Sequence, residues 1–394
     1  MASPPAVLLR DAAVADGERD TLLLGQSVLI RDGRIIKIAP VGEVDPGDAV
    51  VVDAGGATVI AGMVDCHSHL TMPGGSHWIA RGDDPPAVLR EVARQNARRL
   101  VQAGVLWARD VGSPSADGRP VSLAVRDELS GRPGHPYIRV AGTWIGKTGY
   151  PAMWVTVDGD GLVDAALAQL DLGTDLVKVY LDAPGGSHDA PFTAADLRAA
   201  TEAVHARGAR VACHSGYLAG ARVAAEAGVD SIEHGMELDD DVAKVMAKNG
   251  VALVSTLSVF ASWETFARTT QDERFTGDAG RARMAARKAG AYAAVAAARR
   301  AGVRIATGSD FGGGSVRAGH LAWEVELLVA AGLTPLEALN AATRVGGSVL
   351  GHDHAGRIAD GAPADLVLVH GDPLSDPGAL WRVWAVYQAG ERVA

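Results

Sequence analysis

Cysteine is scarce in this chain, which has only Cys66 and Cys213 among its 394 residues. Each cysteine adjoins a histidine in a predicted strand, so we interpret both as small side chains of a buried core. We expect no disulfide between them, because proteins of the cytosol rarely form one.

Long apolar runs are also missing. The N-terminal segment, MASPPAVLLRDAAVADGERD, has no basic start followed by a long apolar stretch and does not match an export signal. The richest apolar stretch, AGAYAAVAAA from residue 289, is too short to span a bilayer and is flanked by Arg and Lys. We therefore expect a cytoplasmic protein without a membrane partner.

Positive charge is not in excess either. The chain has 37 Lys and Arg against 47 Asp and Glu, which gives a net charge of -10. This balance argues against nucleic acid as the main partner. A content of 48% hydrophobic and 21% charged residues is typical of a soluble globular protein with a large core. The composition leaves a homo-oligomer open.

Short β-branched runs alternate with helix-like segments through the middle of the chain. This alternation predicts an α/β fold with a parallel sheet and helical crossovers. The runs are residues 59–69, 104–112, 137–142, 175–181, 210–215, 229–235, 251–256 and 303–310. Eight strand–helix units of about 30 residues match a (β/α)8 TIM-like barrel.

Helix signals lie between these runs. Thr193 is expected to cap a helix that carries Asp196 in its first turn and ends at Gly208. Residues 282–302 predict one long helix, and residues 321–332 and 334–351 predict two more.

The two ends of the chain have a different pattern, with short alternating strands separated by turns. We predict that residues 1–58 and 356–394 pair into one small β-sandwich domain. Residues 59–355 then form the barrel domain.

Six polar residues fall near the carboxyl ends of predicted strands, which is where barrel active sites are built. Two of them form an H-x-H pair, and residues i and i+2 of a strand share one face. The six are His67, His69, Lys178, His214, His234 and Asp310.

Imidazole nitrogens and a carboxylate are suitable ligands for Zn²⁺ or a similar divalent ion. Four histidines and one aspartate exceed the three protein ligands of a usual catalytic zinc, so we expect two ions and a bridging ligand. Lys178 lies in the apolar run DLVKVYL, where an unpaired ammonium would be costly. A neutral lysine amine can add CO₂ and become a carbamate, which could bridge two metals. Lys178 could instead be a Schiff-base lysine or the partner of a buried acid.

Several motifs resemble those of the amidohydrolase superfamily. VIAGMVDCHSHL, DLVKVYLD, SIEHG and TGSD are similar to four of its strand signatures, and GRIADGAPADLVLVHGDPL is similar to its C-terminal segment. GVLWARDVG and AGLTPLEALNAAT further resemble the branch of Xaa-Pro dipeptidases, imidazolonepropionase-like proteins and ochratoxin-type amidases. The resemblance covers nearly the whole chain.

The resemblance implies a binuclear centre, with two zinc ions as the expected metal. His67, His69 and Asp310 would ligate one ion, and His214 and His234 the other, with N6-carboxylated Lys178 as the bridge. The implied reaction is hydrolysis of an amide C–N bond in a small dipeptide-like or N-acyl substrate by a metal-bridging hydroxide. Asp310 would act as base and then as acid.

Five loop residues are candidates for contacts to the substrate. Tyr150 in KTGYP and Tyr217 in HSGYLAG differ from the residues of dipeptidase-like members, and each could donate a hydrogen bond to an oxyanion or pack its loop. His320 resembles a histidine on the substrate side, or caps a helix. Arg317 or Arg81 could bind a substrate carboxylate, or remain in solvent.

Trp78 and Trp263 could line an aryl pocket or pack the loops that cover it.

A mononuclear member that opens a cyclic amide or deaminates a heterocycle is the alternative enzyme. Deaminases of the superfamily usually carry Glu three residues after the fifth-strand histidine, where this chain has Tyr217. A one-metal site also gives Lys178 no role. A non-catalytic scaffold is a third interpretation, but such proteins lose ligands that this chain keeps.

Overall fold

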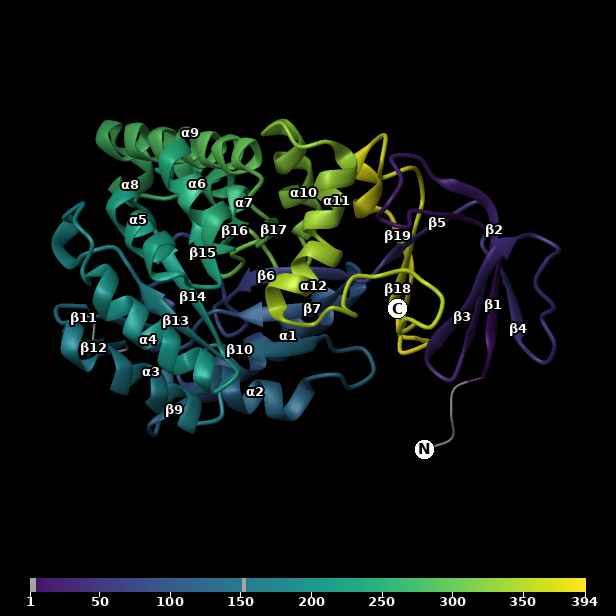
Figure 1. The fold of residues 1–394 in the computed structure, drawn as a ribbon, viewed down its shortest axis with the longest axis horizontal. Helices are drawn as coiled ribbons and strands as arrows, with labels where there is room; N and C mark the ends of the chain where they lie inside the picture. The colour runs from purple at the N-terminus through teal and green to yellow at the C-terminus, as the bar shows by residue number, and fades with distance from the viewer. Residues whose placement is uncertain (1–4, 151–153) are drawn as a thin grey trace.

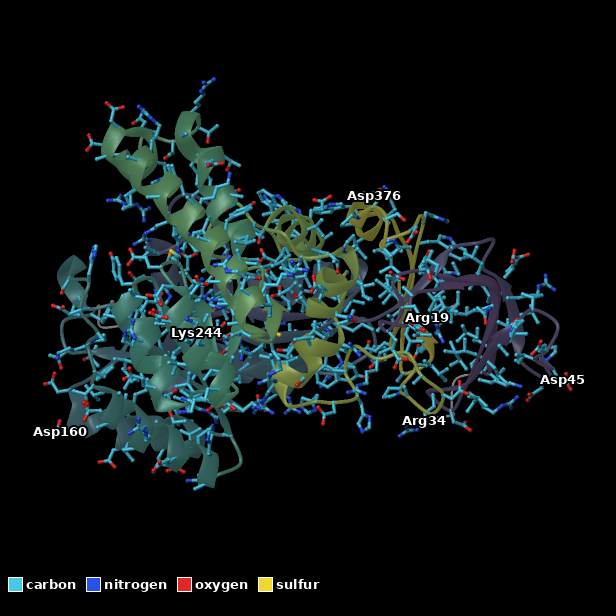
Figure 2. The ribbon with its side chains drawn as sticks, turned by 45° about the horizontal axis from the view of Figure 1, so that its top comes forward. Arg19, Arg34, Asp45, Asp160, Lys244 and Asp376 are labelled. Carbon is cyan, nitrogen blue, oxygen red and sulfur yellow. The ribbon has the colours of Figure 1, made fainter. Side chains whose placement is uncertain are left out.

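The computed structural model describes residues 5–150 and 154–394. Helices surround the central strands at one end of the molecule, and a sheet built from both chain ends lies at the other (Figure 1). Charged side chains such as Asp160 and Asp45 lie at the outline of the molecule and are exposed (Figure 2).

All eight predicted strands are present in the central part, most of them shorter than predicted. They are β6 (Met63–Ser68), β7 (Val105–Asp110), β10 (Tyr137–Val140), β13 (Leu176–Tyr180), β14 (Arg210–Ser215), β15 (Ser231–His234), β16 (Ala252–Ser255) and β17 (Ile305–Thr307). Every pairing among them is parallel, which confirms the α/β prediction.

The strands do not form the single continuous ladder that a closed barrel requires. They divide into the sheets β10-β7-β6 and β12-β11-β13-β14-β15-β16-β17. Two strands that the sequence did not predict, β11 (Ile145–Lys147) and β12 (Val155–Val157), cause part of this difference, because β11 takes the place beside β13.

A few hydrogen bonds connect the two sheets at their seams, and an isolated parallel bridge joins Ser68 to Phe311 at one of them. The backbone N–H of Asp310 donates to the carbonyl oxygen of His67 at 2.8 Å, and that of Asp175 donates to Val140 at 2.9 Å. The ends of β6 and β17 therefore lie next to each other, although their strands belong to different sheets.

Helices connect the strands and cover them. They are α1 (Pro86–Gln102), α2 (Val121–Leu129), α3 (Leu162–Asp171), α4 (Ala194–Ala206), α5 (Leu218–Ala227), α6 (Asp240–Asn249), α7 (Leu257–Trp263), α8 (Glu273–Thr276), α9 (Asp278–Ala301), α10 (Leu321–Ala330), α11 (Pro335–Ala341) and α12 (Arg344–Leu350). The single long helix is confirmed as α9. The segment predicted as one helix over 334–351 is two, because the backbone at Thr343 is not helical (φ -131°, ψ -105°).

Strands from the two chain ends share one sheet, as the prediction of paired termini requires. The order is β20-β19-β18-β5-β1-β2-β3, with β4 beside β1. The strands are β1 (Val7–Val14), β2 (Leu23–Arg31), β3 (Arg34–Pro40), β4 (Val50–Asp53), β5 (Thr58–Ala61), β18 (Leu366–Val369), β19 (Val383–Gln388) and β20 (Glu391–Arg392). A two-layer sandwich and the domain boundaries stay predictions.

The predicted strand 59–69 is divided between these two parts of the molecule. Its first residues form β5 in the terminal sheet, and its later residues form β6 in the central part. Gly62 lies at the division, where a Cβ would stand 2.7 Å from Leu106 Cδ1. Close packing of the backbone on Leu106 thus accompanies the change of sheet.

Two smaller expectations concern thiols and membranes. Cys66 and Cys213 are both buried and free. Among the described residues, no helix combines the length and apolar character needed to cross a bilayer.

Candidate metal centre

A cavity of about 390 Å³ opens at the carboxyl ends of the central strands. All six predicted ligands line it, although they come from five different strands or the loops after them. The six are His67, His69, Lys178, His214, His234 and Asp310.

His67, His234 and Asp310 form the tightest part of this group. One ligand atom from each lies within 4.8 Å of the others, and all three residues are buried. His69 is adjacent, since its Nε2 lies 3.4 Å from Asp310 Oδ1. The Nε2 of His67 lies 3.5 Å from the same oxygen. The spacing fits N/O coordination of a divalent ion.

Three of the histidines are oriented through Nδ1. His67 Nδ1 pairs with Glu233 Oε2 at 2.7 Å, and His69 Nδ1 pairs with the Gly112 carbonyl at 2.9 Å. His234 Nδ1 pairs with Thr256 Oγ1 at 2.6 Å. Such contacts fix the ring orientation of metal-binding histidines and leave Nε2 available.

His214 is held the opposite way round. Its Nε2 pairs with Asp182 Oδ2 at 3.0 Å, and the Tyr180 ring stacks on it at 3.8 Å with an interplanar angle of 8°. Its Nδ1 is buried and has no hydrogen-bond partner among the described residues. Nδ1 is therefore the nitrogen that His214 offers to an ion.

Lys178 lies in β13 between Val177 and Val179, and its side chain is 1% exposed. Its Nζ is buried and makes no hydrogen bond within the described part of the chain. Burial lowers the pKa of Lys178 to about 8, since desolvation disfavours the ammonium. The Schiff-base alternative stays open, whereas none of the acids in residues 5–150 and 154–394 lies within hydrogen-bond distance of Nζ.

Burial also sets the charge of the other candidate ligands. It lowers the pKa of His69 to about 4 and the pKa values of His67 and His234 well below their ordinary value. The imidazoles are therefore neutral, which is the form that binds metal. Burial raises the pKa of Asp310 well above its ordinary value, and a bound cation would reverse that effect. The donor set and the two unpartnered nitrogens thus fit a divalent metal.

The backbone is strained at two of these residues. His234 has φ 68° and Asp310 has φ 50°, a region that residues other than glycine rarely adopt. Gly308 lies close to the same point, because a Cβ there would stand 2.4 Å from His67 Cβ. The chain after β17 thus packs directly on β6, and strain of this kind is typical of functional sites.

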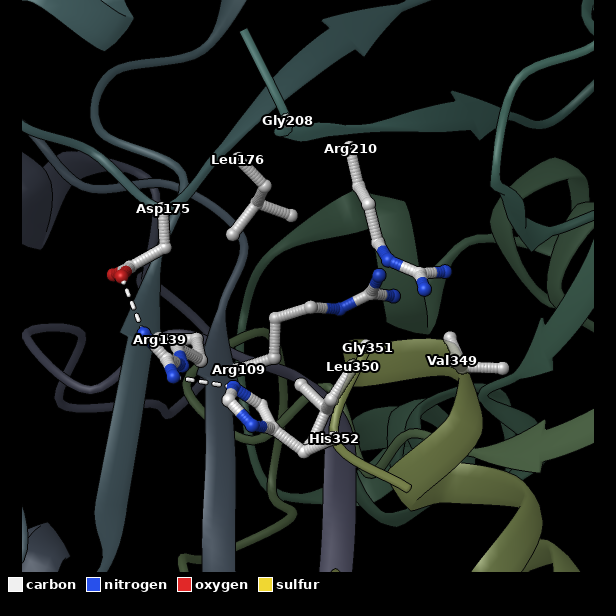
Figure 3. A pocket seen from close by; sticks show the side chains of 10 residues that line it. All are labelled: Arg109, Arg139, Asp175, Leu176, Gly208, Arg210, Val349, Leu350, Gly351 and His352. Atoms are coloured by element: carbon white, nitrogen blue, oxygen red, sulfur yellow. Dashed lines mark hydrogen bonds and ion pairs between the residues drawn. The ribbon is translucent and has the colours of Figure 1, made fainter. Parts of the chain in front are cut away.

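A buried charge pair supports His67 from the other side. Arg109 donates from Nη2 to Glu233 Oε1 at 2.7 Å, while the second carboxylate oxygen holds His67. Arg109 also lines a separate pocket of about 330 Å³ near the first residues of β13 and β14, into which Arg139 and Arg210 extend (Figure 3). Sequence reasoning missed Glu233, although a carboxylate in a buried strand is the same signal that singled out Lys178.

Aromatic rings form much of the remaining cavity wall. Trp78 and Trp263 stack with ring centroids 5.9 Å apart. Both line the cavity, which agrees with the prediction that they could line an aryl pocket. Trp154 stacks on Trp144 at 5.3 Å and on Tyr150 at 4.7 Å. Trp78 and Trp263 are far apart in the sequence, whereas Trp144, Tyr150 and Trp154 come from one short stretch around β11 and β12.

Of the five predicted substrate contacts, Tyr150 lines the cavity, and its hydroxyl donates to the Asp182 carbonyl at 2.6 Å. Tyr217 stacks on His188 at 4.1 Å and is not one of the lining residues.

His320, Arg81 and Arg317, the other three predicted substrate contacts, do not line the cavity either. The His320 ring lies 5.4 Å from that of Trp381, and its side chain makes no capping bond to α10. Arg81 pairs with Asp84, and Arg317 is exposed.

Comparison with known proteins gives a consistent set of similarities. Residues 58–393 match the model of the amidohydrolase family. An uncharacterized protein of Mycobacterium tuberculosis is 33% identical over 358 residues, which cover 89% of this chain and 87% of that protein. The solved structure of a proposed prolidase from Bifidobacterium longum is 28% identical, with a TM-score of 0.84 over 99% of this chain and 94% of that one. Ochratoxinase of Aspergillus niger is 30% identical over 233 residues, 56% of this chain and 47% of its own length.

Proposed function

Because this chain belongs to the amidohydrolase family, we propose that it is a metal-dependent hydrolase that cleaves an amide C–N bond. The substrate class that we propose is a small dipeptide-like or N-acyl molecule. A proposed prolidase and an ochratoxinase among the similar proteins support this class.

Lys178 is the observation that carries the binuclear form of the proposal. Its Nζ is buried without a partner among the described residues, and it lines the same cavity as the four histidines and Asp310. With a pKa of about 8, the amine is partly neutral near physiological pH and can add CO₂. The resulting carboxylate would be an anionic bridge whose charge two cations neutralise.

The proposed ligand sets follow the resemblance. His67, His69 and Asp310 would hold one ion, and His214 through Nδ1 and His234 the other, with carboxylated Lys178 between them. Zinc is the proposed metal, since imidazole-rich sites suit it. Bound divalent ions lower the pKa of water and polarise a carbonyl group.

Asp310 is the proposed proton carrier. It takes a proton from the attacking water and gives it to the departing amine, acting as base and then as acid. Its Oδ1 lies 3.4 Å from His69 Nε2, so the carboxylate is near the nitrogens of the proposed centre.

Tyr150 is the proposed donor to the carbonyl oxygen of the substrate. It lines the cavity, and its hydroxyl would exchange its bond to the Asp182 carbonyl for one to the substrate. Catalytic or binding roles for Tyr217, His320 and Arg317 stay predictions.

The mononuclear alternative has one observation in its favour. His67, His234 and Asp310 are close enough to hold a single ion without the other residues. That arrangement leaves two buried nitrogens without partners among the described residues, Lys178 Nζ and His214 Nδ1. An unsatisfied buried polar atom costs about 1–3 kcal/mol, so we favour two ions.

Amide hydrolysis can be tested with a panel of dipeptides, N-acyl amino acids, cyclic amides and aminated heterocycles. We expect the release of a primary amine from acyclic amides, its loss after treatment with a chelator and its recovery with zinc. Asp310→Asn should lower kcat by about 10²- to 10⁴-fold. The surface variant Asp160→Asn should keep full activity.

Two results would contradict the proposal. Release of ammonia from heterocycles, or cleavage of cyclic amides alone, would favour the mononuclear alternative. An unchanged kcat in Asp310→Asn would remove the proposed proton carrier.

A further inference from the structure

Arg287 is a cation on the wall of the candidate active site to which no role has been assigned. It extends from α9 and lines the cavity together with the six candidate ligands. It is partly buried, and no hydrogen bond or ion pair joins it to any other residue in the described ranges 5–150 and 154–394. Its five N–H donors are therefore available to a ligand.

The helix is built so that Arg287 points inward. Met284 and Ala291, three positions before and four after it, are both buried, so Arg287 lies on the core-facing side of α9. Arg283 lies one position before Met284 and is exposed. An arginine on the buried face of an alanine-rich helix is a signal that sequence reasoning missed.

Close packing brings this part of α9 to the rim of the cavity. A Cβ at Gly290 would stand 2.3 Å from the carbonyl oxygen of Met236, which is itself a lining residue. Only glycine allows the helix to approach the loop after β15 this closely. Arg287 lies one turn earlier and reaches the cavity from there.

Asp182 is a carboxylate that lines the same cavity as Arg287, but both of its oxygens already have other partners. Its Oδ1 accepts from the Gly216 N–H at 2.7 Å, and its Oδ2 pairs with His214 Nε2 at 3.0 Å. Asp182, His214 and Tyr180 are the titratable groups on which Arg287 acts electrostatically. None of them forms an ion pair with it.

The surroundings of Arg287 favour an organic anion. Aromatic and apolar side chains dominate the cavity, among them Trp78, Trp263 and Phe260. A guanidinium binds a carboxylate with two parallel hydrogen bonds, and a cavity that excludes water strengthens them. Flat apolar rings pack favourably against the indole walls.

We propose that Arg287 is a carboxylate-binding residue, and that the ligand is a small amide with a free carboxylate and a flat apolar group. The amide part of this inference rests on the proposed function. The binding part does not, because it concerns Arg287 and the aromatic walls alone.

Binding can be followed through the tryptophan fluorescence of the cavity. The probes are N-acetyl-L-phenylalanine and its uncharged carboxamide, mixed rapidly with the metal-loaded protein so that binding is read before either amide is hydrolysed. We expect the acid to bind roughly 10- to 100-fold more tightly than the carboxamide. Arg287→Gln should reduce this preference to about twofold without weakening the carboxamide, and Arg287→Lys should keep an intermediate preference.

Arg283→Gln on the exposed side of the same helix is the matched control and should keep the full preference. If Arg287→Gln retains the preference, the carboxylate binds elsewhere, for example at the metals, and the inference is wrong. Equal binding of both probes by the unaltered protein would overturn it as well. If the preference depends on Arg287 but no amide is hydrolysed, the binding inference stands and the proposed function fails.

Discussion

At the scale of single residues, burial determines the chemistry of the candidate site. Lys178, His67 and Asp310 are all buried, and for each of them desolvation favours the uncharged form. Buried polar groups without hydrogen-bond partners, such as the nitrogens of these candidate ligands, destabilise a protein interior. The same groups are favourable around cations, because they restore the lost solvation.

The pKa of Lys178 leads to a pH prediction. Carboxylation needs the neutral amine, and a pKa lowered to about 8 makes half of the amine neutral near pH 8. After removal of metal and CO₂, we expect the rate of reactivation at fixed dissolved CO₂ and zinc to rise about tenfold per pH unit below pH 8 and to level off above it. The rate is measured as recovery of bound metal. A rise that continues to pH 10 would indicate an ordinary exposed lysine and contradict the account.

At the scale of elements, the grouping of the six candidate ligands around one cavity could be predicted, because each of them is read from a strand pattern. A lysine in an apolar run and an H-x-H pair at the end of a strand can each be recognised from a few neighbouring residues. The cap of α4 was equally local: Thr193 caps the helix with Asp196 in its first turn, as predicted, and the structure shows that the two form a capping box.

The features that could not be predicted depend on tertiary contacts. β11 pairs with β13 through the single pair Ile145 and Val179, which no periodic pattern announces. Trp144 and Trp154 directly precede β11 and β12, and their rings stack because these two unpredicted strands pair. No sequence pattern predicts that the chain after β17 joins β6 through the backbone of Asp310 and Phe311 rather than by a full ladder.

Gly308 tests the close packing at this junction. In Gly308→Ala the new Cβ would stand 2.4 Å from His67 Cβ and 2.8 Å from Val254 Cγ1, so the backbone must shift. We expect a loss of about 1–3 kcal/mol in the free energy of unfolding, together with weaker zinc binding. Thr193→Ala is the control, because losing this helix cap costs about 1 kcal/mol far from the metal centre. Zinc affinity should be unchanged in Thr193→Ala, and an unchanged affinity in Gly308→Ala would contradict the proposed role of the junction.

At the scale of the whole molecule, the terminal sheet and the central strands share apolar contacts. Val367 of β18 and Ile60 of β5 belong to the same buried cluster as Leu100 and Val105. Gly104 permits one of these contacts, since a Cβ there would stand 2.8 Å from Val367 Cγ1. The terminal sheet is therefore part of the core that holds β6 in place, with His67 in this strand and His69 directly after it.

This shared core predicts one cooperative unfolding transition. Thermal unfolding followed by circular dichroism and by tryptophan fluorescence should give coincident curves, because neither part can lose its packing alone. Val367→Ala should lower the midpoint of both curves together. Two separate transitions, or a shift in only one of the curves, would show that the parts unfold independently.

The central claim is that carboxylated Lys178 bridges two metal ions, and metal analysis tests it most directly. Protein purified without chelators should contain close to two divalent ions per chain, and Lys178→Ala should lose bound metal and amide hydrolysis together. Thermal unfolding of the variant serves to establish that it remains folded. One ion per chain, with full activity in a folded Lys178→Ala variant, would contradict the account.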